Sequence, residues 1–551
     1  MIAIFAVQLS AIFFKVSCIL FCCRVRFTLA VNLYSSNKKQ RKMSVCAKSV
    51  SNAALYELGA VGVEERYTVC DPQKSFFVQC SSRHTNFAFA QLDIEAKHPV
   101  SNLGYWTEGH VLDYEMPKHG DLLLGLWSRM RLGRLTLPVD VITRADNAGL
   151  TKNAQLWNER DEDVSLHWCE EVGFAAIKEA EWRVGSSVLD RLEAEALHMY
   201  HEQGTKEGRI LRNAIGKQRT GNYINSSYTN TGGLRTFSAS DRTLYTPLLF
   251  SFMRNVENAF PHVAIQHNEI RFQLTLRARS NLISAFDVSA GEDAKVALNK
   301  NNPALNTGAA TDSVTGGALI ESALTAELAF LSKPEQESYT RSSFHKYYEY
   351  TQKSAPIRVN ANDKTVQIAN LGFNHSIVQL NVAYRATSKT AAYEYFDFST
   401  VLPVSVAPSS VPGDSNDPLD PLENQTGLSR DLNPFECIEL LYNSAPRVSR
   451  QGVYMHECVP FMRHNRIDDS FSCVYSFAID PESHNGPTGS SNIGRFTTTP
   501  LKLTFIDSAE GVPLGTFGSG ILEGGEVRVY ALTQGFYKIA GGQLALRWSG
   551  P

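Results

Sequence analysis

Apolar and polar residues alternate along much of this chain after residue 65. Every second residue is apolar over Glu269–Arg277, and the segment Val378–Arg385 repeats the pattern. The same period returns near the C-terminus, at Val527 and Val529 and again over 544–548. A period of two is that of a β-strand with one buried face. Because clusters of Gly, Pro, Asn and Asp separate these segments, the pattern predicts an all-β protein made of sandwiches rather than parallel α/β units.

Two segments have the spacing of helices instead. Between Val188 and Tyr200, four apolar residues recur at steps of four and share one helical face, which predicts a helix over Val188–Tyr200. A shorter helix is expected after Pro334, because proline fits the first turn of a helix. We expect few other helices.

One strand near the C-terminus is predicted in more detail. Tyr475, Phe477 and Ile479 are separated by single residues, so in a strand their side chains lie on the same face. We expect residues 475–479 to form a core strand that buries all three and leads into a turn at Pro487–Gly489. A charge introduced at Phe477 should then be strongly destabilising.

Two loop-like stretches divide the chain. Residues 282–318 are rich in Asn, Ala, Gly and Thr, and residues 403–435 contain six prolines among Ser, Asp and Asn. Long stretches of this kind are usually functional surface features. No repeat is visible letter by letter between the two sides. The predicted organisation is an N-terminal extension at 1–64, a first β domain at 65–281, a linker at 282–318, and a second β domain at 319–551 with an exposed loop at 403–435.

The N-terminal extension differs from the rest in charge. Residues 1–42 contain seven basic residues and no acidic one, whereas the whole chain has a net charge of −3. Residues 2–23 are nearly all apolar, but Lys15 lies in the middle of this run, where a membrane helix would bury it at a cost. Two interpretations stay open. In the first, translation starts at Met43 and residues 1–42 are not part of the protein; in the second, they form an extension that faces a membrane.

Composition excludes several classes of protein. Apolar residues make up 43% and charged residues 20% of the chain, so it is not a disordered protein. Its slightly negative charge does not indicate binding to nucleic acid. The ten cysteines include no CxxC pair, which predicts reduced, mostly buried thiols in an intracellular compartment rather than disulfides or a zinc site.

No spacing in the sequence indicates a catalytic, cofactor or metal site. His201-Glu202 and His456-Glu457 each lack the second histidine of a metalloprotease helix. Neighbours in a strand point to opposite faces, so we expect Glu170 and Glu171 to be paired or solvated rather than to form a catalytic pair. Single histidines near predicted turns are expected to form structural hydrogen bonds: His84, His119, His267, His375 and His464.

Three N-x-S/T triplets occur in the chain, and such triplets arise often by chance. Only the triplet at Asn424 lies in a stretch expected to be an exposed loop. Asn424 is therefore the candidate for N-glycosylation, and the triplets at Asn225 and Asn374 are expected to be unmodified.

A series of short motifs runs through both halves of the chain in a fixed order. The first half contains Ser75-Phe76-Phe77 and then Arg83, His84, Thr85, Asn86 and Phe87. The second half contains Phe373, Asn374 and His375, then Tyr475, Ser476 and Phe477, then Pro481, Pro487, Gly489, Asn492 and Arg495. Together with segments between them, these motifs resemble the major capsid proteins of nucleocytoplasmic large DNA viruses of the iridovirus and algal-virus type. The resemblance spans about residues 65–550, although Ser376 stands where proline is usual and Thr488 where serine is usual.

This resemblance implies a fold and a function. The fold would be two consecutive eight-stranded jelly rolls, and three chains would form a trimeric, pseudo-hexameric capsomer that tiles an icosahedral shell. The chain would be part of the virion and assemble in the host cytoplasm. Its partners would be further copies of itself, minor capsid proteins and, through the N-terminus, an inner viral membrane. No direct contact with nucleic acid and no enzymatic activity are expected.

Two other functions remain open at this point, because a fold alone does not fix a function. A double jelly roll also occurs in carbohydrate-binding and glycan-cleaving proteins. The acidic residues Asp414, Asp417 and Asp420 are a weak candidate for a calcium-binding loop of a lectin. A minor capsid protein is a further alternative, but such proteins usually have one jelly roll, and the two β halves count against it.

Overall fold

A computed structural model of the chain describes most of the two predicted β domains. The described residues are 84–97, 106–136, 164–206, 209–217, 238, 240–287, 296–297, 315–391, 393–399, 433–482, 486–506 and 524–547. The extension 1–64, residues 403–432 of the predicted loop, Arg83 and Asn424 lie outside them. All elements below belong to the compact unit Thr85–Pro551.

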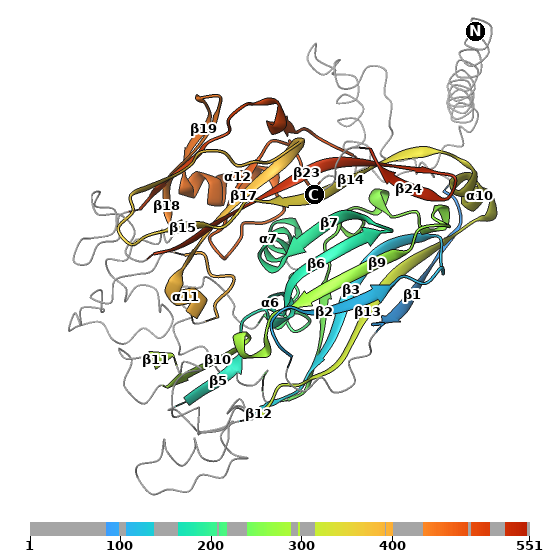
Figure 1. Cartoon of the computed structure of the whole chain (residues 1–551), viewed down its shortest axis with the longest axis horizontal. Helices are drawn as coiled ribbons and strands as arrows, with labels where there is room; N and C mark the ends of the chain where they lie inside the picture. Colours follow the sequence, from blue (N-terminus) through green and yellow to red (C-terminus); the bar gives the residue numbers. More distant parts are fainter. Residues whose placement is uncertain are drawn as a thin grey trace, which may run out of the picture. The chain divides into compact units, whose positions relative to one another are not determined.

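The first half of this unit is a sandwich of two four-stranded antiparallel sheets (Figure 1). Their strand orders are β1-β13-β3-β8 and β2-β9-β6-β7. Counted in chain order from one to eight, these strands follow the order 1-8-3-6 in one sheet and 2-7-4-5 in the other. The strands are β1 (Phe87–Glu95), β2 (His110–Glu115), β3 (Leu122–Leu132), β6 (Ile177–Val184), β7 (Ser187–Glu193), β8 (Arg242–Pro247), β9 (Ile270–Leu276) and β13 (Leu319–Leu331).

The second half repeats the same strand order. Its sheets are β14-β23-β17-β20 and β16-β22-β18-β19, which again read 1-8-3-6 and 2-7-4-5. Two sheets connected in this way form a jelly roll, so the described residues contain two jelly rolls and the predicted fold class is confirmed. The strands are β14 (Phe344–Lys353), β16 (Thr365–Ile368), β17 (Ser376–Ala386), β18 (Phe435–Tyr442), β19 (Ala445–Gln451), β20 (Cys473–Ser476), β22 (Leu501–Phe505) and β23 (Gly525–Ala540).

Shorter elements complete the two sandwiches. The short strands are β4 (Leu135–Thr136), β5 (Val164–Trp168), β10 (Ile283–Asp287), β11 (Val296–Ala297), β12 (Thr315–Gly316), β15 (Ile357–Val359), β21 (Ser491–Asn492) and β24 (Gln543–Leu546). The helices are α6 (Val172–Ala175), α7 (Ala194–Gly204), α9 (Ser251–Arg254), α10 (Lys333–Arg341), α11 (Thr387–Ala391) and α12 (Val459–Arg463), with single turns between strands. None of the helices that the structure describes is long and apolar enough to cross a membrane.

The sheet pairing places the change of jelly roll later than the sequence division does. Strand β13 was expected in the second domain, but it is hydrogen-bonded between β1 and β3 of the first jelly roll. Its last residue, Leu331, pairs with Phe87 at the start of β1. Because β13 is the closing strand of the first sandwich, the second jelly roll begins only after α10. The Asn/Ala/Gly/Thr-rich stretch therefore precedes the last strand of the first jelly roll and is no linker between jelly rolls.

The predicted helix over Val188–Tyr200 is partly wrong. Residues 187–193 form strand β7, which pairs with β6, and helix α7 runs from Ala194 to Gly204. The apolar residues at steps of four continue across this boundary. They fit a strand as well as a helix, because an even number of steps along a strand returns to the same face. The shorter helix expected after Pro334 is confirmed as α10, with the proline in its first turn.

The predicted strand 475–479 is shorter than expected. Strand β20 ends at Ser476, and Tyr475 and Phe477 are half-buried against the second core. Ile479 is 68% exposed, so the expectation that it faces the core is wrong. The chain leaves the sheet after Phe477, whose backbone N–H still donates to the carbonyl of Val378.

Strand β17 is buried on both faces. One face carries Leu380, Val382 and Tyr384 into the core of the second jelly roll, while Val378 and Ala383 belong to the core of the first. The sequence predicted a half-exposed strand here. The difference arises because the first jelly roll packs against the face that alternation leaves polar.

No disulfide joins the four cysteines that the structure describes. Cys169 and Cys473 are buried, Cys437 is intermediate and Cys458 is exposed. The expectation of mostly buried thiols thus holds for only part of the described set.

Candidate functional site: the charged junction between the jelly rolls

Helix α7 lies between the two jelly rolls and is buried along its length (Figure 1). Its apolar side chains pack in the core, but Glu195, His198 and Glu202 are also at most 1% exposed. A buried charge is costly unless it is paired, so each of these groups needs a partner. We call the three residues and their ionic partners the charged junction.

At the N-terminal end of α7, the carboxylate of Glu195 lies among three arginines. Its Oε1 is 3.0 Å from Arg277, 2.9 Å from Arg385 and 3.2 Å from Arg528. Arg277 follows β9 of the first jelly roll, whereas the other two belong to β17 and β23 of the second. Burial acts to raise the pKa of Glu195, but the three guanidinium charges outweigh it and hold the pKa far below its usual range. One carboxylate therefore joins strands of both jelly rolls.

Further groups balance the three arginines. The Glu526 carboxylate lies 2.8 Å from Arg385 and 2.7 Å from Arg528. The guanidinium of Arg277 stacks over the Tyr395 ring at 4.0 Å from its centroid. Arg385 and Arg528 thus each have a second carboxylate partner. Among the described residues, Arg277 forms an ion pair with Glu195 alone. This arrangement makes Glu195 the centre of the network.

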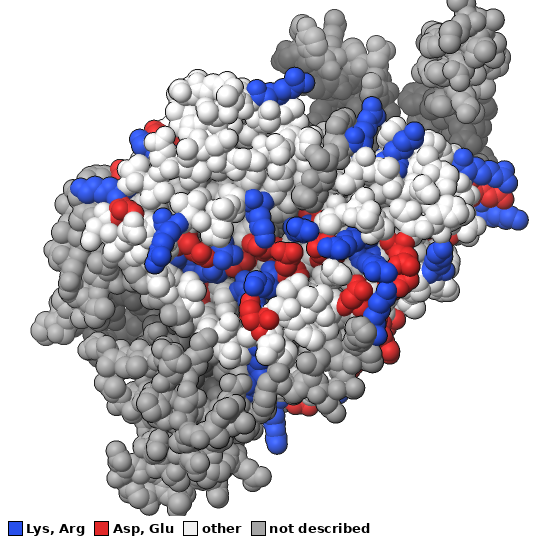
Figure 2. Space-filling model, viewed as in Figure 1, with Lys and Arg blue, Asp and Glu red and all other residues white. Residues whose placement is uncertain are grey.

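The network continues to the surface along the same boundary. Lys353 of β14 lies 2.5 Å from Glu193 and 3.4 Å from Glu179, which belong to the first jelly roll. The Tyr530 hydroxyl donates to Glu193 at 2.7 Å. Figure 2 shows acidic and basic side chains alternating along a band that crosses the middle of this face. Ion pairs at this boundary are therefore not confined to the interior.

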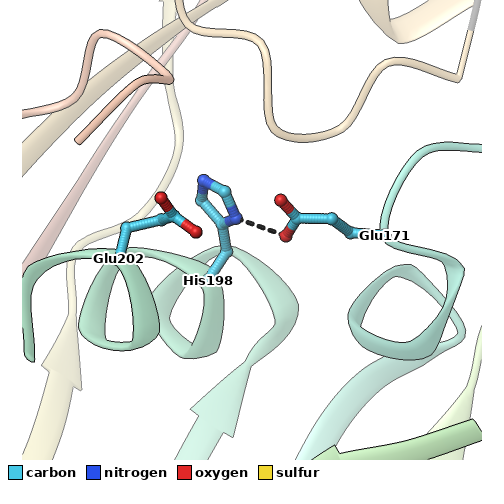
Figure 3. A group of neighbouring side chains, drawn as sticks. All are labelled: Glu171, His198 and Glu202. Atoms are coloured by element: carbon cyan, nitrogen blue, oxygen red, sulfur yellow. Dashed lines mark hydrogen bonds and ion pairs between the residues drawn. The ribbon is translucent and has the colours of Figure 1, made fainter. Parts of the chain in front are cut away.

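At the other end of α7, a second cluster surrounds His198 (Figure 3). The Nδ1 atom of His198 is 2.6 Å from Oε2 of Glu171, which precedes α6. The Lys217 ammonium lies 3.1 Å from Glu171 and 2.8 Å from Glu202. Burial acts to raise the pKa of Glu171, but His198 and Lys217 lower it to about 2. Glu171 is thus paired, as expected, although it stands in a left-handed turn with φ of 51° rather than in a strand.

Residues of the second jelly roll close this cluster. Arg466 lies 2.7 Å from the second oxygen of Glu202, and Oδ1 of Asp468 lies 3.9 Å from Nε2 of His198. The Phe396 ring stacks on the His198 ring with a centroid distance of 4.6 Å and an interplanar angle of 16°. Both ring nitrogens and one ring face of this histidine therefore meet groups that come from the two jelly rolls.

The same cluster has the spacing of a metal site, but not its chemistry. Donor atoms of Glu171, His198 and Glu202 lie within 4.8 Å of one another. The Lys217 ammonium already supplies positive charge between both carboxylates, and a metal ion would have to displace it. We interpret these residues as a buried ion-pair network.

A polar contact beside β7 adds to the junction. The Oδ1 atom of Asp190 accepts hydrogen bonds from the backbone N–H of Arg191 and, at 2.8 Å, from that of Thr351 in β14. Asp190 is fully buried, and this burial raises the pKa of its carboxyl to about 7. Gln203 of α7 also bonds the Asn381 side chain of β17 at 3.2 Å. Neutral hydrogen bonds thus accompany the ion pairs.

The motif residues of the second half gather around the start of β17. Ser376 pairs with Asn492, and Gln379 pairs with Ser476. The Asn374 backbone bonds the Gln352 side chain of β14 through both its N–H and its carbonyl. His375 adopts a φ of 64° at the turn into the strand. The other residues of this group are Phe373, which is buried, Tyr475 and Phe477, which are half-buried, and Arg495, which is exposed.

Three motif residues line a cavity of about 190 Å³ at the C-terminal end of α7. These are Pro481, Pro487 and Gly489, and the opposite wall includes Tyr200 and His201. The motif residues of the first half lie elsewhere: His84, Thr85 and Asn86 precede β1, and Phe87 begins it. The motifs therefore do not form one site.

The residues of the charged junction were not predicted from the sequence. Their partners come from distant positions, as with Glu195 and Arg385, which are separated by 190 residues. One signal was present: charged side chains of α7 recur at Glu195, His198 and Glu202, which places them near one another on the helix.

Comparison with known proteins agrees with this architecture. The family described as major capsid protein N-terminus matches residues 75–315, and the large eukaryotic DNA virus major capsid protein family matches residues 337–543. The major capsid protein of Phaeocystis pouchetii virus is 22% identical over 90% of this chain and 99% of its own length. That of Pyramimonas orientalis virus is 22% identical over 82% of this chain and 92% of its own length.

Solved structures share the fold at low sequence identity. The PBCV-1 virus capsid superposes with a TM-score of 0.59 at 16% identity, covering 86% of this chain and 100% of that one. The Faustovirus major capsid protein has a TM-score of 0.58 at 12% identity, covering 90% and 98%. Because two family matches follow one another along the chain and each falls on one jelly roll, this chain belongs to the major capsid proteins of large eukaryotic DNA viruses.

Proposed function

We propose that this chain is the unit from which the outer shell of a large icosahedral DNA virus is built, as trimers of pseudo-hexagonal outline. The observation that carries the proposal is the repeated strand order in the two jelly rolls. Three copies would contribute six similar jelly rolls, so a trimer would approach sixfold symmetry and could pack densely in a shell. In a closed threefold ring, the complementary side surfaces of each chain would be buried in the interfaces between chains.

The charged junction supports this role because a tile must keep a fixed shape. If the two jelly rolls could turn against each other, the outline of the trimer would vary. Glu195 and Glu202 each bind residues of both jelly rolls while almost fully buried. Breaking such pairs leaves uncompensated buried charge, which resists rotation.

Membership of this family also leads us to propose binding partners for the chain. Further copies of the chain would bind its flanks, and minor capsid proteins would bind the trimer from the inner side. The N-terminal extension 1–64 would face an inner viral membrane, and the loop 403–435 would face outward. Because the chain carries a net charge of −3, we expect no direct contact with the genome. Assembly would take place in the host cytoplasm, and Asn424 would be the position open to glycosylation.

We propose that the motif residues act as a scaffold and not as a ligand site. Asn374, Ser476 and Asn492 hold the start of β17 through pairing and backbone hydrogen bonds. We further propose that the chain has no enzymatic activity. In support, the carboxylates Glu171, Glu195 and Glu202 are all engaged in buried ion pairs and are shielded from solvent.

Mass measurement tests the proposal directly. Size-exclusion chromatography with light scattering on the full chain should give about 183 kDa, three times the 61.1 kDa of one chain. Interfaces of permanent oligomers are typically large and apolar at the centre, so the mass should not fall on dilution to the micromolar range. A stable particle of 61.1 kDa at micromolar concentration would contradict the proposal. Turnover or binding of glycans would instead favour the carbohydrate-related alternatives.

A further inference from the structure

The imidazole of His198 lies between two carboxylates from different jelly rolls. Its Nδ1 faces Glu171 of the first at 2.6 Å, and its Nε2 faces Asp468 of the second at 3.9 Å (Figure 3 shows the Glu171 side). A neutral imidazole carries one N–H and no net charge, whereas the protonated ring carries a positive charge and directs an N–H towards each carboxylate. At 3.9 Å, the contact with Asp468 is a charge–charge contact and not a hydrogen bond, whereas the contact with Glu171 is both. We propose that His198 is doubly protonated in the folded chain and links Glu171 to Asp468, so that the contact between the jelly rolls weakens when His198 loses a proton.

The charges around the ring agree with a protonated histidine. The buried carboxylates are Glu171, Glu202 and Asp468, whose side chains are at most 1% exposed. The cations near them are Lys217, 9% exposed, and Arg466, 10% exposed. Three negative and two positive charges leave an excess of one negative charge, which a protonated His198 cancels. Since a buried net charge is costly, the proton removes that cost.

The other charged groups near His198 are already paired or lie closer to solvent. On α7 itself, Glu195 belongs to the separate arginine network and His201 lies 3.4 Å from Glu202. On the segment 393–399, Phe396 and Phe398 supply rings, and Asp397 is paired with Lys389 at 2.8 Å. Asp469 lies 2.5 Å from Arg466, but its side chain is 37% exposed, so it is not counted among the buried carboxylates.

The Asp468 side chain is held in place by hydrogen bonds from its own loop. Its carboxylate accepts the backbone N–H of Ser470 at 2.8 Å and the hydroxyls of Ser470 and Ser472. These hydrogen bonds fix the carboxylate in position, so the partner whose state can change in this contact is the histidine.

The direction of the pH dependence follows from the same contacts. Burial acts to lower the pKa of His198, but Glu171, Asp468 and Glu202 outweigh it and raise the pKa above the ordinary value of 6.5. A raised pKa in the folded chain means that the stabilisation is complete below pH 6.5 and is lost as the pH rises through the raised value. The junction should thus be tight in acid and weaker in alkali. Because both partners lie in one chain, the inference does not depend on trimer formation.

The test compares the full chain with His198→Gln, which is neutral at every pH. Apparent Tm values would be measured at a fixed scan rate from pH 6 to pH 9. The unsubstituted chain should lose at least about 2 °C across this range, and the variant should start lower and lose less. Hydrogen exchange, corrected for its intrinsic pH dependence, should show α7 and residues 464–472 becoming less protected in the unsubstituted chain.

Two further variants keep the test decisive. His262→Gln is the matched control, because His262 is buried in the first jelly roll and its described ring contact is the Gly120 carbonyl. This control should keep the fall between pH 7 and pH 9. If His198→Gln does not fold, Asp468→Asn should move the fall to lower pH, since it removes one carboxylate that holds the proton. A flat profile for the unsubstituted chain, or an unchanged fall in His198→Gln or Asp468→Asn, would overturn the inference. Light scattering on the same samples reports trimer formation separately.

Discussion

Substitution of Glu195 by glutamine should destabilise the junction strongly. Glutamine has nearly the same shape, so the change removes the charge without leaving a cavity. Loss of one partner of a buried ion pair costs about 3–5 kcal/mol in general. Arg385 and Arg528 keep Glu526, and Arg277 keeps the Tyr395 ring, so we expect the lower end, about 3 kcal/mol.

The measurement is the apparent Tm of the full chain, at a fixed scan rate and neutral pH. Trp168 and Trp182 are both about 1% exposed and report unfolding by fluorescence. For a loss of about 3 kcal/mol, Tm should fall by about 3 °C if the two jelly rolls unfold together and by about 6 °C if they unfold separately, since the entropy of unfolding is about 2 cal/mol/K per residue. The matched control is Glu526→Gln, which contacts two of the same arginines but has a side chain 30% exposed. Because Glu526 is partly exposed and Glu195 remains beside both arginines, the control should lose about 1 kcal/mol or less. Its Tm should therefore fall by about 2 °C or less, clearly less than that of Glu195→Gln.

The reasoning depends on the position of Glu195 at the centre of three arginines. If Glu195→Gln lowers Tm no more than Glu526→Gln, burial of the central carboxylate does not determine the stability of the junction. An additional loss of structure confined to one jelly roll would also be informative. It would show that Glu195 stabilises one sandwich rather than the contact between the two.

Three other substitutions test separate parts of the structure. Asp190→Asn should flatten the stability profile between pH 4 and pH 7 in an apparent-Tm series. Burial raises the pKa of Asp190 to about 7 in the folded chain, whereas the unfolded chain loses this proton near the ordinary value of 3.8, so the carboxyl lowers stability as the pH rises through this window. An unchanged slope in the variant would contradict this assignment. Phe477→Asp should cost about 1–3 kcal/mol and reduce the trimer fraction in light scattering, because Phe477 is half-buried against the second core. An unchanged fraction would count against that packing. Gly452→Ala should lower Tm, since an added Cβ would lie 2.0 Å from the Phe435 carbonyl oxygen; an unaltered Tm would show that the backbone yields there.

Alternation predicted the strands well, but not what covers each face. Strand β9 is buried at every second residue from Ile270 to Leu276, as its pattern indicated. Strand β17 has a similar pattern, yet Gln379, Asn381 and Arg385 are buried too. A period of two separates two faces of a strand, and it cannot distinguish a face in contact with water from one in contact with buried polar groups.

The ion pairs of the charged junction could not be predicted from the sequence for a related reason. Helix α7 shows its charges in the sequence, but their partners lie just after β9, on β17 and β23, and in the loop before β20. Which of the chain's basic residues meets Glu195 depends on how two jelly rolls pack. The misplaced start of the helix has a local cause, because an even spacing of apolar residues fits β7 as well as α7.

Electron microscopy of the purified full chain tests the central claim most directly. Class averages viewed down the symmetry axis should show a particle with threefold symmetry and six similar lobes, because each of three chains contributes two jelly rolls of the same strand order. A particle with only two lobes and no threefold symmetry would contradict the claim that this chain forms the tile of a viral shell.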